Sequence, residues 1–478
     1  MQTTSPIIVW FRRDLRLSDH PALHAAARLG RPVIPVFVAD ALVDDLGAAP
    51  SLRLEMSLDA LAKSLEAVGS RLVLRQGQAA EELDHLIAVT GAQSVYWTRA
   101  YDPGSVARDT AIKADLKARG IEARSFGGAL MFEPWTVTTK AGTPHKVYTP
   151  FWKTVRDRAV DAPLPAPERL VPPEVWPASD RLSQWALSAR MQRGAGVVRA
   201  RVRAGEEAAL RKLSAFVSGP IEQYKDLRDF PAENVTSALS DHLATGEISP
   251  HQCWHAGQRA LADGAAGAEH FLKEVVWREF AYHLMHHTPH ILTGNWRPEW
   301  DSFPWQVDDD SDEVRAWKQG RTGIEMIDAA MRELYVTGRM HNRGRMLVAS
   351  YLTKHLMTHW QIGLRWFEDC LVDWDPASNA MGWQWAAGSG PDAAPYFRVF
   401  NPELQGQKFD PDKRYIRHWV AEGQGAPGAD ALAFFDAVPR SWALSPHDAY
   451  PAPIITSAAG RARALAAYQA RKSAQNVA

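Results

Sequence analysis

Cysteine, long apolar runs and an excess of one charge are nearly absent from this chain. Only Cys253 and Cys370 occur among 478 residues. Two cysteines cannot cross-link a protein of this size, so the composition favours a reducing compartment, the cytoplasm. No apolar run approaches the roughly 20 residues that a membrane helix needs, and MQTTSPIIVWF lacks the pattern of a signal peptide. We expect no membrane contact. Because the formal net charge is −1, any nucleic-acid site must be a local basic patch.

A glycine-rich dinucleotide-binding motif is also missing from the first 130 residues. The first apolar run is followed by FRRDLRLSDHPAL rather than GxGxxG, which argues against the usual Rossmann site. Leucines at helical spacing predict a helix over 52–68, and short apolar runs on either side predict buried strands. The predicted strands are Ile7–Phe11, Val33–Val38, Leu72–Leu74 and Val95–Thr98. Alternating strands and helices predict an α/β domain with a doubly wound parallel sheet.

Strand-like runs almost vanish in the second half of the chain, where helical periodicity dominates. Between the halves, the proline-rich PLPAPERLVPPEVWPASD at 163–180 predicts an extended connector on the surface. We therefore expect an α/β domain over 1–130, an interdomain linker over 131–204 and an all-α domain over 205–478. The last should hold about a dozen helices, and its alanine-rich tail predicts a short final helix over 459–471.

Tryptophan is abundant, with 19 residues, and three of them fall within 373–410, DWDPASNAMGWQWAAGSGPDAAPYFRVFNPELQGQKFD. The same segment holds Asp373, Asp375 and Asn379. Buried carboxylates and amides are costly without partners, so this mixture predicts the wall of a site for a large, flat ligand with polar edges. By themselves, the two aspartates could equally form a general acid–base couple or a metal site.

A second motif, NVTSALSDHLATGEISP at 234–250, stands at the start of a predicted helix. Thr236, Ser237 and Ser240 place hydroxyl and backbone N–H groups there. Unpaired N–H groups and the helix dipole favour a bound phosphate. A plain helix cap is the simpler alternative.

A third motif, FLKEVVWREFAYHLMHH at 271–287, puts Glu274, Trp277 and Arg278 on one helix face. Taken alone, it would be an ion pair beside a core tryptophan. The histidines at 283, 286, 287 and 290 share a face, but no cysteine or carboxylate stands at metal-ligand spacing. We expect no metal.

A fourth motif, GRMHNRGRMLVASYLTKHL at 338–356, lines one helical face with His341, Asn342, Arg345 and Met346. A helix face with an amide, a guanidinium and a thioether is unlike the apolar face of a core helix, because burying its polar groups would be costly. This face suits the wall of a site.

These motifs, in this order and over nearly the whole chain, resemble the photolyase/cryptochrome family, most closely a bacterial cyclobutane pyrimidine dimer photolyase. The resemblance implies an N-terminal α/β domain joined by a long linker to a helical FAD-binding domain. It also implies blue-light-driven repair, in which reduced flavin donates an electron to the dimer and receives it back after the ring splits. Photolyases take the lesion out of the duplex, so the implied partner is damaged DNA, bound by a monomer.

The resemblance assigns one set of residues to the flavin. Asp373 and Asp375 would hold the ribityl chain and the isoalloxazine edge, and Asn379 would face flavin N5. The implied FAD-binding residues are Tyr224, Thr236, Ser237, Ala238, Leu239, Ser240, Phe271, Arg278, Arg345, Asp373, Asp375 and Asn379. Many relatives have a basic residue where this chain has Ala238. Either phosphate affinity is weaker here, or Arg345 supplies the charge.

A second set is implied at the lesion. Glu274 would hydrogen-bond the dimer, Trp277 and Trp385 would stack against it, and Asn342 and Met346 would shape the pocket. Relatives that repair (6-4) photoproducts have histidines at the last two positions, so this chain fits cyclobutane dimers. Arg339 replaces the aromatic residue usual at its position. The implied DNA contacts are Arg228, Glu274, Trp277, Asn342, Arg343, Met346, Trp385 and Gln405, with Arg398, Lys408, Lys413, Arg414 and Arg417 as further basic candidates.

Three tryptophans, Trp383, Trp360 and Trp305, correspond to the chain that passes electrons from the surface to the flavin. With Glu274 and Asn342 they complete the implied catalytic set. Trp317 lies close to Trp305 in the sequence and is the alternative outer end.

An antenna chromophore is common in the family, and its identity stays open here. Gly104 and Ser105 stand where folate-binding relatives have asparagine and glutamate, which leaves a folate held differently, a deazaflavin, a second flavin or nothing. Two other functions are also open. A cryptochrome-type photoreceptor would keep FAD without repair, and an electron carrier would not explain Glu274, Trp277 and Trp385 beside the flavin.

Overall fold

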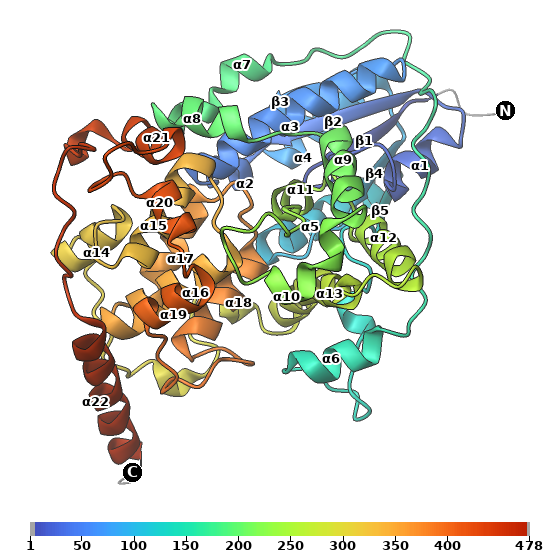
Figure 1. The fold of residues 1–478 in the computed structure, drawn as a ribbon. Coiled ribbons are helices and arrows are strands. Elements are labelled where there is room, and N and C mark those ends of the chain that lie inside the picture. The colour runs from blue at the N-terminus through green and yellow to red at the C-terminus, as the bar shows by residue number, and fades with distance from the viewer. Residues whose placement is uncertain (1–4, 476–478) are drawn as a thin grey trace.

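The computed structural model describes residues 5–475. Its first domain is built on a five-stranded parallel sheet with the order β3-β2-β1-β4-β5 and helices on both faces (Figure 1). Side chains alternate along β1, so that Val9 joins the apolar cluster under α3 and Trp10 joins the cluster under α4 and α5. The doubly wound parallel sheet is thus confirmed. The elements are β1 (Ile7–Phe11), α1 (Pro21–Ala27), β2 (Val33–Ala39), α2 (Ala41–Asp44), α3 (Ala48–Ala67), β3 (Val73–Gln76), α4 (Ala79–Thr90), β4 (Ser94–Thr98), α5 (Pro103–Ala118) and β5 (Glu122–Phe126).

The strand predictions differ from the structure at three strands and miss a fourth. Strand β2 runs one residue further than expected, to Ala39, and β4 begins one residue earlier, at Ser94. Strand β3 begins one residue later than expected and runs to Gln76. Strand β5 was not predicted, because only Ala123 of its five residues is buried and no apolar run marks it. An edge strand that packs through one side chain lacks the pattern by which buried strands are recognised.

The proline-rich region between the domains contains more structure than an extended connector. Helix α6 (Tyr148–Val155) buries Tyr148, Phe151, Trp152 and Val155, a helical spacing, in the cluster that surrounds α13. Residues 156–181 contain no helix or strand. The other elements here are η1 (Pro134–Thr136), α7 (Leu182–Trp185), η2 (Leu187–Met191) and α8 (Gly194–Arg201).

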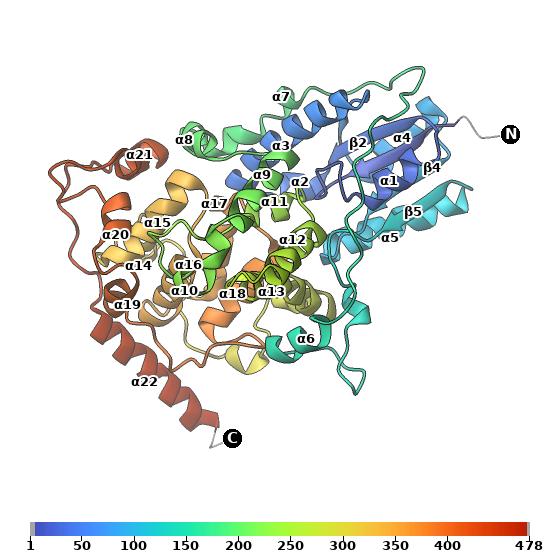
Figure 2. The same cartoon turned by 45° about the vertical axis from the view of Figure 1, so that its right-hand side comes forward.

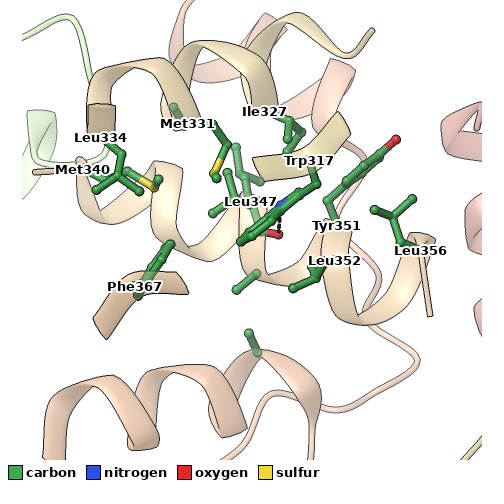
Figure 3. Packing of buried hydrophobic residues seen from close by; sticks show 14 of the residues in the cluster. Trp317, Ile327, Met331, Leu334, Met340, Leu347, Tyr351, Leu352, Leu356 and Phe367 are labelled. Carbon is green, nitrogen blue, oxygen red and sulfur yellow. Dashed lines mark hydrogen bonds between the residues drawn. The ribbon is translucent and has the colours of Figure 1, made fainter. Parts of the chain in front are cut away.

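The remainder of the described chain is helical, with fourteen α-helices, α9 to α22. Figure 3 shows Trp317 of α14 in the centre of its core, among Ile327, Met331, Leu347 and Leu352. The elements are α9 (Glu206–Val217), η3 (Pro220–Glu222), α10 (Tyr224–Leu227), α11 (Ser240–Thr245), α12 (Pro250–Ala262), α13 (Ala268–His287), η4 (Pro289–Leu292), η5 (Pro298–Trp300), α14 (Asp312–Lys318), α15 (Glu325–Thr337), α16 (Asn342–Ser350), η6 (Tyr351–His355), α17 (Trp360–Cys370), α18 (Pro376–Ala387), α19 (Pro402–Phe409), α20 (Arg414–Trp419), α21 (Ala429–Ala437), η7 (Arg440–Trp442) and α22 (Ser457–Gln475).

The final helix, α22, is longer than predicted and lies at the edge of the molecule farthest from the sheet (Figures 1 and 2). None of the helices in residues 5–475 is both long and apolar enough to cross a bilayer.

The segment after β1, where a Rossmann domain would have its glycines, instead joins the two domains. Arg13 Nε donates to the carbonyl of Ala244 at 2.9 Å, and Arg16 Nη1 donates to that of Gly246 at 2.9 Å. Gly246 has φ +72°, and a Cβ there would lie 2.1 Å from the Arg13 carbonyl oxygen. Only glycine permits this approach, which fixes α11 against the sheet domain.

Candidate functional site

A cavity of 820 Å³ opens among α10, α11, α13, α16 and α18. Its volume is typical of a site for a sizeable organic ligand. All of the predicted site residues line it except Trp305, Trp360, Arg343 and Gln405. The predicted residues in the wall are Tyr224, Arg228, Thr236, Ser237, Ala238, Leu239, Ser240, Phe271, Glu274, Trp277, Arg278, Asn342, Arg345, Met346, Asp373, Asp375, Asn379, Trp383 and Trp385.

One wall of the cavity is the loop 236–240. Ala238 is left-handed, with φ +48°, and the next residue, Leu239, is right-handed, with φ −93° and ψ −3°. Successive residues of opposite hand turn their N–H groups toward a common point and form an anion-binding concavity. Within residues 5–475, none of the N–H groups from Thr236 to Ser240 donates to a protein acceptor. The loop therefore offers free donors to a phosphate.

Asp375 lies at the base of the cavity and caps α18. Its Oδ1 accepts the N–H of Ser378 at 2.8 Å, and its Oδ2 accepts the hydroxyl of Tyr282 and, at 3.3 Å, Nη2 of Arg13. Burial alone would raise the pKa of Asp375, but the charges of Arg13 and Arg278 outweigh it and lower that pKa. This carboxylate is ionised and held in place by the α/β domain.

Asp373 and Arg345 form an ion pair in the cavity wall, with 2.7 Å between Oδ2 and Nη2. Arg345 also donates to the carbonyl of Met340 at 2.8 Å. Its guanidinium therefore pairs with Asp373 and not with the loop 236–240. The second oxygen of Asp373, Oδ1, is buried without a hydrogen-bond partner, and a ligand hydroxyl would satisfy it.

The mouth of the cavity carries Glu274 and Arg228, which form an ion pair. The Glu274 side chain is 36% exposed, so it is open to a ligand entering from solvent. Beside it, Trp277 stacks on Tyr148 at 3.7 Å between centroids and 8° between planes, which makes a rigid, flat wall. Across the mouth, Asn342 Nδ2 lies 3.8 Å from Met346 Sδ.

Asn379 projects into the cavity from α18. Its Nδ2 donates to the carbonyl of Leu364 on α17 at 3.1 Å. That bond fixes the orientation of the amide, leaving its oxygen as the free acceptor.

Trp383 connects the cavity to the interior of the helical domain. Its ring packs on Gly363 of α17, where a Cβ would lie 2.0 Å from the ring, and Trp360 is one turn earlier on the same helix. Trp360 and Trp305 both pack against His359, at centroid distances of 5.5 and 5.3 Å. Trp317 is 6.2 Å from Trp383 but fully buried, whereas Trp305 is 7% exposed.

The DNA-contact candidates outside the cavity are partly engaged with protein partners and partly exposed. Arg343 is 9% exposed, pairs with Asp229 at 2.6 Å and lies 4.3 Å over the ring of Phe409. Gln405 has its Oε1 buried without a partner. Lys413 and Arg414 pair with Glu325 and Glu233, both at 2.6 Å, while Arg398, Lys408 and Arg417 are exposed.

Sequence reasoning missed several residues that contact the cavity wall from outside, through Asp375 and Trp277. Tyr148 belongs to the proline-rich region, Arg13 to the α/β domain, and Tyr282 lies two turns beyond Glu274 on α13. Glu333 of α15, also missed, lines the cavity itself, and burial raises its pKa to about 7. For Arg13, the sequence offered one indication: FRRDLRL stands where a glycine motif would be expected. That indication did not identify Asp375 as the contact of Arg13.

A second, smaller cavity of 150 Å³ lies at the carboxyl ends of β1, β2 and β4. Ligands of open parallel sheets bind at this edge. Arg12, Arg99 and Arg108 line it, together with Ser105 and the apolar side chain of Leu42.

Comparison with known proteins agrees with this geometry. Residues 7–168 match the family described as DNA photolyase, and residues 271–470 match the FAD binding domain of DNA photolyase. A deoxyribodipyrimidine photo-lyase of Agrobacterium fabrum is 46% identical over 98% of both chains.

Among solved structures, a bacterial class III photolyase from Agrobacterium tumefaciens has a TM-score of 0.90 at 46% identity, over 98% of both chains. An archaeal photolyase from Sulfolobus tokodaii with two FAD molecules has a TM-score of 0.78 at 30% identity, over 97% of this chain and all of that one. The family expected from the motifs is confirmed: the chain belongs to the DNA photolyase family and carries its FAD-binding domain.

Proposed function

We propose that the chain is a deoxyribodipyrimidine photo-lyase that splits cyclobutane pyrimidine dimers in DNA under blue light. One observation carries the proposal. The residues expected at the lesion, Glu274, Trp277, Asn342 and Met346, line the same cavity as those expected at the flavin. When bound in its reduced form, FAD absorbs blue light, donates an electron to the dimer and regains it after the ring splits, so the reaction is redox-neutral.

The cavity suits FAD by the chemistry of its walls. The free N–H groups of 236–240 would hold the diphosphate, and the unpartnered Oδ1 of Asp373 would accept a ribityl hydroxyl. The neutral amide of Asn379, fixed by its bond to Leu364, would face the flavin ring. Tyr224, Phe271 and Arg278 complete the flavin set, and the apolar helices around it exclude water.

The mouth of the cavity would receive the dimer after it leaves the duplex. Trp277, held flat by Tyr148, and Trp385 would stack against the lesion. Glu274 would exchange its contact with Arg228 for a hydrogen bond to the dimer, freeing Arg228 for a backbone phosphate. Asn342 and Met346 would fit a cyclobutane dimer rather than a (6-4) photoproduct.

The DNA surface would surround this mouth. Arg343 and Gln405 contribute from α16 and α19, with Arg398, Lys408 and Arg417 as exposed cations. Each phosphate neutralised by such a side chain makes binding more sensitive to salt.

Resting flavin would be reduced through Trp383, Trp360 and Trp305. The first touches the cavity, the last two share His359, and Trp305 is the outermost. Trp317 is fully buried, so it does not suit the exchange of electrons with a donor in solvent.

The second cavity would hold an antenna chromophore. Its lining combines apolar side chains with five arginines and three aspartates, which suits a flat ligand that has both aromatic and polar parts. A related archaeal photolyase carries two FAD molecules, and here the identity among folate, deazaflavin and flavin stays open.

We assign these tasks to the α/β domain 1–130, the linker 131–204 and the helical domain 205–478. We propose that the chain acts as a monomer. Both cysteines are free thiols in the structure, which agrees with the cytoplasm.

The test is light-dependent repair of two oligonucleotides by pre-reduced protein, one with a cyclobutane thymine dimer and one with a (6-4) photoproduct. We expect intact thymines from the first and no change in the second. Repair of the (6-4) lesion would contradict the role given to Asn342 and Met346. Repair of neither by protein with bound, reduced FAD would favour a cryptochrome-type photoreceptor.

A further inference from the structure

The loop 236–240 is backed by an unusual group of buried charges. Asp241, fully buried, directly follows the loop. Its carboxylate contacts Arg339 of the segment before α16, Arg53 of α3 at 3.5 Å and Lys212 of α9 at 3.7 Å. Arg53 also pairs with Glu247, which is equally buried. Three cations from three parts of the chain therefore face two carboxylates.

The group has more positive than negative charge. Arg53, Asp241 and Glu247 are fully buried, whereas the side chains of Arg339 and Lys212 are 22% and 26% exposed, so the surplus positive charge is on side chains that an anion can approach. Burial lowers the pKa of Lys212 to about 8. The charge of Asp241 opposes this shift, and the charges of Arg339 and Arg53 add to it. The surplus lies next to the free N–H groups of the loop, because Lys212 Nζ donates to the carbonyl of Ala238 at 2.9 Å.

Arg339 has the geometry to reach a ligand. Its side chain is 22% exposed and lines the same cavity as Ser237 and Ser240. One Nη is bound to Asp241, while its Nε is buried without a partner. Its backbone is fixed by the turn that ends α15, where Gly338 has φ +67° and lies against Val372. The side chain is therefore directed by the fold and not fully satisfied by it.

We infer that Arg339, supported by Lys212, holds the diphosphate of FAD and supplies the positive charge that the loop lacks at Ala238. This inference rests on the proposed use of the cavity for FAD. Asp241 orients the guanidinium through one Nη, leaving the other Nη for the anion. The two departures from the family pattern then compensate for each other. The positive charge that relatives have in the loop, where this chain has Ala238, is supplied here by Arg339 in the segment before α16.

The experiment measures the affinity of flavin-free protein for FAD and for riboflavin, which lacks phosphate, in the dark and without DNA. We expect Arg339→Gln to weaken FAD binding about tenfold or more, the effect of losing a charge-assisted hydrogen bond, with riboflavin binding nearly unchanged. Arg339→Lys should recover part of the loss. Arg201→Gln, which removes an arginine of similar exposure paired with Asp430, is the matched control and should bind FAD as the unaltered chain does.

A structural role for Arg339 would give different results. If it only neutralises Asp241, the double variant D241N/R339Q, which leaves no buried carboxylate unpaired at this position, should regain full FAD affinity. That recovery would overturn the inference, as would an equal loss of FAD and riboflavin binding or no loss of either. The double variant also provides the test if Arg339→Gln alone fails to fold. Failure of repair with intact FAD affinity would count against the proposed function and leave this inference standing.

Discussion

At the scale of single residues, Glu274 is the side chain on which lesion recognition depends most. It projects from α13 at the mouth of the cavity, 36% exposed, and among residues 5–475 its one ion pair is with Arg228. Glu274→Gln keeps the shape and removes the charge. We expect repair per absorbed photon to fall about tenfold, the effect of weakening a charge-assisted hydrogen bond, while bound FAD is retained.

The measurement is the repair yield of the reduced protein under limiting light, with FAD content determined on the same sample. Glu269→Gln is the matched control, because Glu269 lies on the same helix and pairs with Lys273 away from the cavity. Loss of FAD from Glu274→Gln during purification would show a structural role instead.

Glu279, on the same helix, gives a prediction for stability. It is 2% exposed, and its Oε2 accepts the N–H groups of Met131 at 2.9 Å and Phe132 at 3.1 Å. Burial raises its pKa from 4.5 to about 7. Between these two pH values the folded protein keeps the proton on Glu279, whereas the unfolded chain has released it. The stability from this group is fully present below about pH 4.5 and is lost as the pH rises to about 7.

A shift of this size corresponds to roughly 3 kcal/mol in the free energy of unfolding. Glutamine cannot ionise. When the pH is raised from 5 to 8, the free energy of unfolding should therefore fall less for Glu279→Gln than for the unaltered chain. Denaturant unfolding at the two pH values measures the difference. Glu333 titrates in the same direction, but it is present in both proteins and cancels. Equal losses would show that Glu279 is ionised in the fold.

At the scale of elements, α17 and α18 position the tryptophans relative to the cavity. The absence of a side chain at Gly363 lets the Trp383 ring lie against α17. Trp383→Phe should block photoreduction of oxidised flavin yet spare repair once the flavin is chemically reduced, because only the first process uses the tryptophan chain.

Absorption spectra during illumination with an external reductant follow photoreduction, and the dimer assay follows repair. Trp419→Phe, which alters another buried tryptophan, on α20, controls for loss of packing. Normal photoreduction in Trp383→Phe would remove this residue from the electron route.

Helices and strands were predictable from the sequence where their buried side chains form an uninterrupted apolar pattern. Strand β1 has five buried residues and was found to the residue, and α3 was found with its leucine stripe. Strand β5 was missed because it buries one side chain. Helix α6 was missed because its four buried residues stand in a region whose prolines indicated an extended chain.

At the scale of the whole molecule, the motifs placed most of the cavity wall, and distant pairings supplied the rest. Local residue types and helical spacing were enough to find Asp375 and Glu274. They were not enough to find Arg13, which contacts Asp375 from 362 residues away, or Tyr148 behind Trp277. Nor did they show that Arg345 is occupied by Asp373, while Arg339 pairs with Asp241 and lines the same cavity as the loop 236–240. Such pairings depend on how the two domains and the connector pack, which no local pattern encodes.

The central claim is that light and reduced FAD together split the dimer in this cavity. The most direct measurement compares four samples of the protein with a dimer-containing oligonucleotide: flavin reduced or oxidised, each in blue light or in the dark. We predict intact thymines only in the reduced, illuminated sample, with the flavin still reduced afterwards. Repair in the dark, or none in the reduced and illuminated sample, would contradict the account.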